Sequence, residues 1–403
     1  MNNLTIDKSK AITQRNYAVE LPYIDIKQRA RSKQWVNFDR DNLYPARVYN
    51  MYKESPLQSA IINNQVKYTY GAGLADYDAS IFTPNLMERW EDLIKKCIQD
   101  YCIFQAFAIQ IIPNESMSKY SFYHIPVNQV RLGAYNEENV IEYAYLATDW
   151  SQVNNKNVVE IKMWGTEQPQ AGERYLWYCK PYDPDELFYA IPKWMSCANW
   201  VLADIALSKY YLNYIKNNFS ANLSIAYPNE PDDDKKQEIY DMLNASFAGE
   251  DNAGSILLLF GENGVLPTTS SIESKDADLY QNVCDTVLKY IVSGNRLISP
   301  ILAGLATSSG FSSKSDEIIA AYTLYKLTVI DEIRDFVLNK INTLLQLNGY
   351  PRCLVLQDYN FAKEFEGSTA MNDEKEKEQT NTDEDAANAD EQITEQNKEG
   401  GKV

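Results

Sequence analysis

Helical periodicity is the strongest pattern in the chain, and it recurs in segments separated by glycine and proline. Ser55-Pro56 predicts the start of a first helix, because serine is a favoured cap and proline suits the first helical position. Further helices are predicted over residues 84–99, 232–247 and 276–293. A final long helix is predicted after a capping-box pattern at Ser313 and Asp316; it ends at Gly349 and is about 45–50 Å long at 1.5 Å per residue.

Residues 193–219 change period sharply and predict one long helix with an apolar stripe along it. The stripe combines two seven-residue repeats, four positions apart: Trp194, Val201, Ser208 and Ile215, with Ala198, Ile205, Leu212 and Phe219. Such a stripe packs either against the chain's own core or against the same helix of a neighbouring subunit. Taken alone, the pattern favours the core.

Strand-like stretches dominate residues 120–190, where short β-branched or aromatic runs are separated by Asn, Gly and Pro. They predict a small β-rich module. The apolar run Cys102–Ile112 predicts a strand before it, and residues 222–227 and 255–260 predict two more. The predicted fold class is therefore α+β.

Polar segments separate and flank these elements. Residues 1–45 are broken by prolines and predict an extended arm, and residues 261–274 predict an exposed loop. Residues 366–403 hold few hydrophobic and many charged side chains. We expect this tail to be disordered, because it cannot bury enough surface to offset the entropy lost on ordering.

The net charge of −18 changes the expected partners. Residues 372–403 hold eleven acidic and four basic side chains, a net of −7, which leaves −11 on residues 1–371. Tight DNA binding comes largely from Lys and Arg, so an acidic body argues against it. A wall that repels phosphate still suits a conduit that DNA slides through.

The sequence holds few of the motifs that carry chemistry. Its six cysteines include no C-x-x-C pair and its only histidine is His124, so a zinc site is disfavoured and no metal or cofactor is expected. A phosphate-binding P-loop and a G-x-S-x-G elbow are absent from the sequence. We interpret His124 as structural, and we predict that the chain is not an enzyme.

Targeting signals are also missing from the sequence as given. The first sixteen residues lack the apolar core of a signal peptide, and no stretch has the apolar length needed to cross a bilayer. Scattered cysteines are typical of a reducing compartment. These features predict a protein made inside the cell, with no membrane partner.

Three segments together resemble the portal family of tailed phages, the head–tail connectors, and especially those of phages that infect Bacteroidetes. The first is DNLYPARVYNMYKESPLQSAIINNQVKYTYGAGL, residues 41–74. The second, residues 190–227, resembles the stem helix followed by an Asn-Phe and a strand. The third, residues 295–349, is similar to the family's Ser-Pro…Gly…Gly-Phe-Ser block and the long helix after it. The usual Asn-rich step is replaced here by Ser313-Lys314-Ser315.

The resemblance implies a portal-type fold that assembles as a ring, usually of twelve copies, around a DNA channel at one capsid vertex. The implied parts are a 1–40 N-terminal arm, a 41–120 first wing part, a 121–189 β-rich clip, a 190–219 stem helix, a 220–294 second wing part with a channel loop at 261–274, a 295–365 helical upper wing and crown-proximal region, and a 366–403 acidic tail.

The resemblance also implies site residues and partners. Subunit packing would use the stem-helix residues Trp194, Val201, Ile205, Leu212, Ile215 and Phe219. Weak contacts to DNA would come from Thr268, Thr269, Ser270, Ser271 and Lys275. Expected partners are further copies of the chain, the terminase ATPase, a head–tail adaptor, the major capsid protein and double-stranded DNA without sequence specificity. The expected location is the virion, and the host cytoplasm during assembly.

Two other functions remain open from the sequence. A different virion or capsid-assembly protein without a channel would share the acidic charge and the missing catalytic motifs. An enzyme that uses carboxylates, with or without a metal, would be detected by metal content and by nuclease and hydrolase assays.

Overall fold

The structure is a computed structural model, and it describes residues 34–75, 83–153, 157–184, 186–216, 224–227, 231–232, 234–238, 257–260, 277–305, 315–350 and 353–360. Several sequence-based predictions therefore lie outside the described residues. These are the extended arm up to residue 33, the loop at 261–274, most of the predicted helix 232–247 and the acidic tail 366–403.

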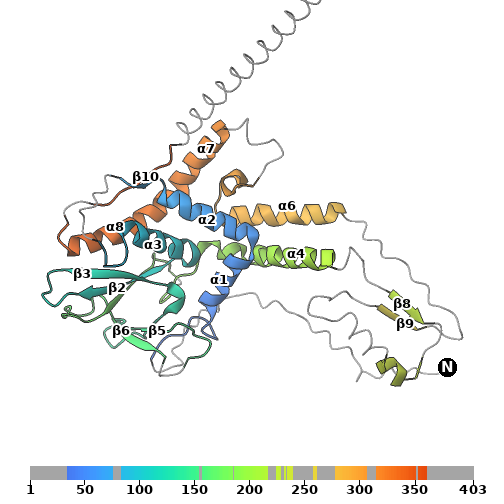
Figure 1. The fold of residues 1–403 in the computed structure, drawn as a ribbon, viewed down its shortest axis with the longest axis horizontal. Helices are drawn as coiled ribbons and strands as arrows, with labels where there is room; N and C mark the ends of the chain where they lie inside the picture. Colours follow the sequence, from blue (N-terminus) through green and yellow to red (C-terminus); the bar gives the residue numbers. More distant parts are fainter. Residues whose placement is uncertain are drawn as a thin grey trace, which may run out of the picture.

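The described elements are helices together with a largely antiparallel sheet whose strands follow one another in the sequence, which confirms the α+β class (Figure 1). The helices are α1 (Tyr44–Glu54), α2 (Pro56–Tyr70), α3 (Trp90–Phe104), α4 (Ala198–Lys216), α6 (Ala277–Gly294), α7 (Ser315–Tyr325) and α8 (Asp331–Leu347), with the short turns η2 (Val127–Gln129), η3 (Lys193–Cys197) and η4 (Pro300–Ala303) and a π turn η5 (Lys326–Ile330). The strands are β1 (Gly73–Leu74), β2 (Phe107–Pro113), β3 (Tyr120–Ile125), β4 (Val130–Leu132), β5 (Tyr143–Leu146), β6 (Val159–Met163), β7 (Tyr175–Cys179), β8 (Ser224–Tyr227), β9 (Leu257–Phe260) and β10 (Leu356–Gln357). None of these described helices is long and apolar enough to cross a membrane.

A six-stranded sheet forms one layer of the body, in the order β3-β2-β7-β6-β5-β4. Adjacent strands in this sheet are antiparallel, except for β6 and β7, which are parallel. Strand β2 pairs with both β3 and β7, and the expected wing–clip boundary at residues 120/121 falls inside β3. Helices α3 and α8 lie over this sheet, and Phe107 of β2 contacts Phe336 of α8 (Figure 1).

Helix α2 has an oppositely charged side chain at each end. At its start Ser55 accepts a hydrogen bond from the Gln58 N–H, at 3.1 Å, as the Ser55-Pro56 pattern predicts. Asp204 of α4 accepts hydrogen bonds from the Ser55 hydroxyl at 2.5 Å and the Leu57 N–H at 3.2 Å. At its end Arg334 of α8 donates to the carbonyls of residues 69 and 68, at 2.7 and 3.0 Å. Both charges complement the helix dipole, so α2 joins α4 to α8.

Two predicted boundaries differ from the structure. The predicted helix 84–99 is instead α3, Trp90–Phe104, because Asn85 folds the preceding residues into a turn by accepting hydrogen bonds from the N–H groups of residues 87 and 88. The strand predicted from Cys102 begins at Phe107, after a left-handed residue, Gln105, ends the helix. Helix α1 begins at Tyr44, so its first two residues fall within residues 1–45, which were expected to form an extended arm.

The predicted long C-terminal helix is confirmed as a continuous run through α7, η5 and α8. Its apolar face joins the main core, in which Tyr325, Ile330, Val337 and Ile341 are fully buried. The π turn in the middle departs from the i→i−4 hydrogen-bond ladder, a feature that often marks functional sites.

Candidate assembly site: a helical arm and the joint at its base

Helices α4 and α6 form an antiparallel pair that projects from the body, and we call this pair the arm (Figure 1). Helix α4 leads away from the body and α6 returns to it. Strands β8 and β9 come between them in sequence and pair in parallel beyond the far end of the arm. The arm is thus the main feature of the described chain that extends out of the folded body.

Close packing holds the two helices of the arm together. A Cβ placed on Gly294 would overlap the Cβ and Sγ of Cys197, so only glycine allows this approach. Further along, the rings of Trp200 and Tyr290 stack at 4.4 Å with an angle of 10° between them. The proximal half of the arm is therefore a fixed pair of helices.

Buried polar groups fasten the arm to the body. The amides of Gln58 on α2 and Asn295, just after α6, exchange two hydrogen bonds of 3.1 and 2.7 Å. The same Asn295 amide donates to the carbonyl of residue 291 at 2.9 Å. Trp194 in η3 donates its indole N–H to the carbonyl of Ile103 at 3.1 Å. Breaking any of these contacts would leave a buried polar group without its partner, which costs more than the bond itself contributes.

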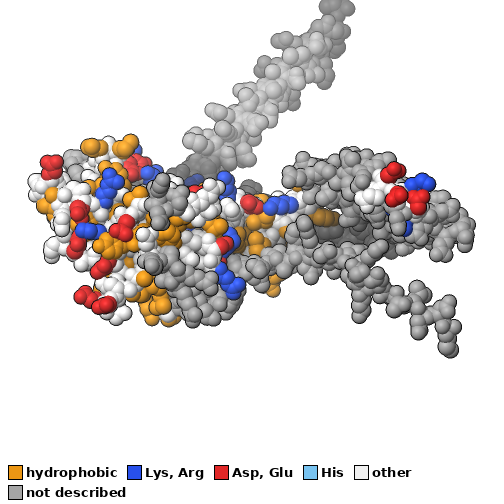
Figure 2. Space-filling model, turned by 90° about the horizontal axis from the view of Figure 1, so that it is seen from below, with side chains coloured by type: hydrophobic (Ala, Val, Ile, Leu, Met, Phe, Trp, Pro, Cys, Tyr) orange, Lys and Arg blue, Asp and Glu red, His pale blue; other side chains and the backbone are white. Residues whose placement is uncertain are grey.

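The distal half of α4 exposes aromatic and apolar side chains in more than one direction. Residues 208–212 are all exposed, and they include Tyr210, Tyr211 and Leu212, the last at 52%. Successive helical residues point about 100° apart, so these three side chains do not form a single face. Figure 2 shows hydrophobic side chains at the surface where the arm leaves the body. Tyr211 also contacts the other helix of the arm, where its hydroxyl lies 3.9 Å from the Sγ of Cys284.

The predicted subunit-packing residues separate into two groups in the structure. Val201, fully buried, and Ile205 pack into the chain's own core, as does Trp194, which lies in η3 rather than in α4. Their burial leaves them no surface for a neighbouring subunit. Leu212 is exposed, and its role in packing stays a prediction. The side chain of Ile215 and the whole of Phe219 lie outside the described residues, as do the predicted channel residues Thr268, Thr269, Ser270, Ser271 and Lys275.

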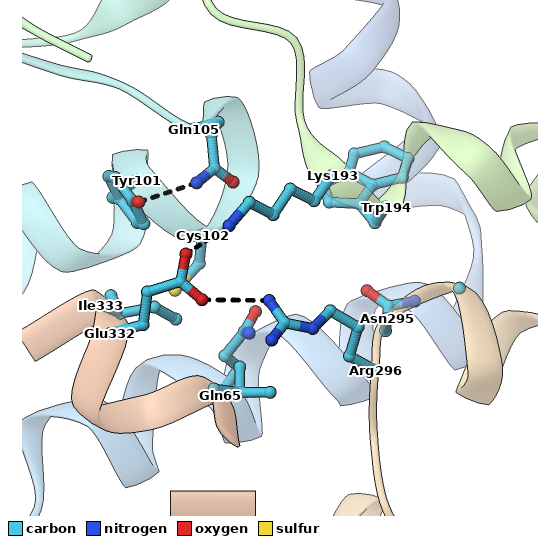
Figure 3. A pocket seen from close by; sticks show the side chains of 12 residues that line it. Gln65, Tyr101, Cys102, Gln105, Lys193, Trp194, Asn295, Arg296, Glu332 and Ile333 are labelled. Atoms are coloured by element: carbon cyan, nitrogen blue, oxygen red, sulfur yellow. Dashed lines mark hydrogen bonds and ion pairs between the residues drawn. The ribbon is translucent and has the colours of Figure 1, made fainter. Parts of the chain in front are cut away.

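A small cavity of about 40 Å³ lies at the base of the arm, and we call this place the joint (Figure 3). It is lined from four directions, by α2, α3, the turn η3 and the α8 end of the long helix, with Asn295 and Arg296 closing it. Glu332 stands between two cations, forming ion pairs with Lys193 of η3 and with Arg296, the latter at 3.1 Å. One carboxylate therefore connects two segments at the base of the arm to α8: the turn before α4 and the turn after α6.

Arg296 has a second role in the joint. Its backbone adopts the left-handed region, at φ 57°, which is uncommon for residues other than glycine. Its guanidinium also donates to the carbonyl of Thr328, at 2.6 Å, inside the π turn. The contact holds the turn after α6 against the π turn of the long helix.

The ionisable groups in the joint are poorly suited to catalysis. Burial raises the pKa of the Cys102 thiol well above its usual range, so little reactive thiolate forms. Burial also raises the pKa of the Tyr101 hydroxyl. For Glu332 burial acts to raise the pKa, but hydrogen bonds from Lys193 and Arg296 outweigh it and the net pKa is lowered. The carboxylate is thus held charged, as an ion-pair partner.

The His124 side chain is largely buried and has a structural contact. Its Nε2 lies 2.9 Å from the carboxylate of Asp100 on α3, which also accepts the N–H of Val127 at 3.0 Å. The interaction ties β3 and the following turn to α3, in agreement with the structural interpretation. Among the residues that the structure describes, no group of three metal-ligating side chains comes together.

The sequence predicted the arm helix α4 but not the residues that attach the arm to the body. Asp204 carried a signal, as a carboxylate within an apolar helix. Gln58, Asn295 and Glu332 carried none, because isolated polar residues are ordinary in a sequence and only the tertiary contacts bring them together.

No family model matches this chain, and no curated protein matches it. Solved structures share its fold. A chain from the neck of a native gene transfer agent (GTA) particle, computed with C12 symmetry, superposes with a TM-score of 0.53 at 14% identity, covering 85% of this chain and 91% of that one. A chain from the neck of an empty GTA particle, computed with C6 symmetry, gives 0.51 at 13% identity over 82% and 87%. A chain from the virion of a native GTA particle gives 0.51 at 14% identity over 80% and 85%.

Proposed function

We propose that this chain is the portal subunit of a tailed phage, and that copies of it form a ring through which DNA enters and leaves the capsid. The observation that carries the proposal is the distal half of α4, where Tyr210 and Leu212 are 42% and 52% exposed and point in different directions. In a ring each copy meets two neighbours through two different surfaces, which is what such a helix requires. The shared fold with a chain in a neck of C12 symmetry supports the same assembly.

We assign the portal parts differently from the sequence-based expectation. The whole arm, α4 with α6, takes the role of the stem, because the two helices pack along each other and project together. The pair β8–β9, between them in sequence, then takes the place of the clip. The six-stranded sheet shares its core with α3 and α8, so we assign it to the wing.

The proposed action is passive and needs no catalytic group. The ring sits at one vertex of the capsid, where it contacts the major capsid protein. It binds the terminase ATPase and a head–tail adaptor, and it guides double-stranded DNA. The net charge of −18 suits this role, since an excess of acidic over basic side chains weakens binding to phosphate. The joint would keep the stem at a fixed angle to the wing while DNA passes.

Electron microscopy of the purified full chain tests the proposal. End-on views are expected to show closed rings with an axial opening that admits a DNA duplex. A closed ring without such an opening would favour the alternative, a structural neck protein without a channel. Single chains at every concentration would contradict both.

A further inference from the structure

The chain enters the described structure along one edge of the six-stranded sheet, and its entry is firmly held. Trp35 pairs with Gly133 in an antiparallel bridge, and the N–H of Val36 donates to the carbonyl of Leu132 at 2.8 Å. The Trp35 ring also contacts the ring of Tyr145, with 5.7 Å between centroids. Strand β4 is the last strand of the sheet, so these residues cover the start of its outer edge.

The same edge continues into residues 133–142, which join β4 to β5 and which we call the hairpin. Tyr135 pairs with Ile141 across it. Tyr135 is 42% exposed, and its hydroxyl donates to the carbonyl of Leu187 at 3.2 Å, which places the 66% exposed Leu187 nearby. Glu137 follows at the exposed turn of the hairpin. Beyond the entry of the chain, the edge therefore presents exposed apolar side chains and then a carboxylate.

The residues that precede Gln34 carry a sequence pattern that suits this edge. We call residues 27–33 the basic segment, because cations stand at every second position and no acidic residue lies between them: Lys27, Arg29, Arg31 and Lys33. A period of two is that of a strand, in which such side chains share one face. Residues 1–33 hold seven basic and three acidic side chains, a net of +4, which leaves −22 on the rest of the chain.

We infer that the basic segment lies along the outer edge of the hairpin of its own chain, continuing the strand that Trp35 and Val36 begin. Trp35 pairs antiparallel with Gly133, so the chain before Gln34 leaves in the direction in which the hairpin runs from residue 134 onward. The segment is attached directly to the edge that it covers, which gives it an effective concentration on the order of millimolar there. The inference goes beyond the ring and holds for the single chain.

This register assigns partners to two of the cations. Counting back from the bridge, Lys33 lies opposite Tyr135, whose ring attracts a cation, and Arg31 reaches the Glu137 carboxylate. The aliphatic stems of both side chains then lie over Leu187. Cations held in this way are withdrawn from DNA, in agreement with a wall that binds phosphate weakly.

Trypsin tests the docking, because it cleaves after the cations of the basic segment. In the purified full chain, cleavage within residues 27–33 is expected to be at least about tenfold slower than in a synthetic peptide of residues 21–36, since the segment must leave the edge to be cleaved. The variant Tyr135→Ala/Glu137→Gln is expected to speed this cleavage at least about fivefold. It should unfold at the wild-type urea midpoint, because both side chains are exposed.

The matched control is Leu86→Ala/Glu115→Gln. It removes an exposed apolar side chain and a carboxylate of the turn between β2 and β3, at the opposite edge of the sheet. It should leave the cleavage rate of the basic segment unchanged.

A charge exchange tests the register. Arg31→Glu alone is expected to speed cleavage after Lys27 and Lys33, sites that every variant keeps, because it places two carboxylates together; each rate is divided by that of the matching peptide. Adding Glu137→Arg restores an ion pair and should return the ratio to within about twofold of wild type. Failure of the second substitution to rescue the first would overturn the assigned pairing.

The remaining outcomes identify other occupants of the edge. Cleavage of the wild-type segment as fast as the peptide would overturn the inference. So would protection that appears only as the protein concentration rises, which would place the segment on another copy, or protection that appears only when a DNA duplex is added. None of these results decides whether the chain forms rings, so this inference and the proposed function fail separately.

Discussion

At the residue scale, a few side chains decide how the arm is attached. Gly294 permits the close crossing with Cys197, the Gln58–Asn295 pair satisfies two buried amides, and Glu332 links two cations to α8. These contacts act between segments that are far apart in the sequence. Each can be tested singly, because each predicts a different sign or a different pH dependence.

Gly294→Ala is expected to lower the free energy of unfolding by about 1–3 kcal/mol, because the added methyl overlaps Cys197. Helix propensity predicts the opposite sign, since alanine is favoured over glycine in a helix. Urea unfolding measures the difference. Ser293→Ala, at the neighbouring exposed position, should stay within about 0.5 kcal/mol of wild type. A Gly294→Ala variant as stable as wild type would show that the crossing is not tight.

Glu332 predicts a modest pH dependence of the joint. Its pKa is lowered in the folded chain, so its contribution is present above the unfolded pKa and is lost as pH falls through the folded pKa. Because the carboxylate is about half exposed, we expect under about 1 kcal/mol. Comparing Glu332→Gln with wild type by urea unfolding between pH 7 and pH 3 should show the difference shrinking as the pH falls. A constant difference would contradict the ion-pair role.

At the scale of elements, local signals predicted more than tertiary ones. The α2 start was predictable because Ser55 and Pro56 act within one turn. The start of α3 was missed because Asn85 needs the carbonyl of Phe122, which only the folded sheet supplies. The apolar stripe on α4 was predictable from its spacing. Which part of the stripe packs into the core was not, because that depends on how far the body extends along α4. The joint was not predictable, because it consists of contacts between elements.

The two halves of α4 should respond differently to the same substitution. Val201→Asp places a carboxylate at a fully buried site and should lower the free energy of unfolding by more than about 3 kcal/mol. Leu212→Asp, at an exposed site, should leave unfolding unchanged and reduce ring formation. Urea unfolding and sizing by light scattering distinguish the two. If Leu212→Asp formed rings as well as wild type, the distal half of α4 would not be part of the contact between subunits.

At the scale of the whole molecule, the chain has a body with a large buried core and an arm whose outer half is partly exposed. In the proposed ring, stability and assembly would be carried by different surfaces, so we expect that exposed sites can be altered without unfolding the chain. The net charge of −18 on each copy would oppose that assembly by repulsion between copies. Added salt screens that repulsion, so ring formation should rise between low and physiological ionic strength.

The mass of the purified full chain in solution shows whether copies of the chain form a closed ring. Twelve copies of 46.2 kDa give about 554 kDa. Native mass spectrometry is expected to show one oligomer near that mass, or near another whole multiple of the chain mass, with few smaller oligomers. A spectrum that holds only the 46.2 kDa chain, at all concentrations and salt conditions, would contradict assembly through the arm.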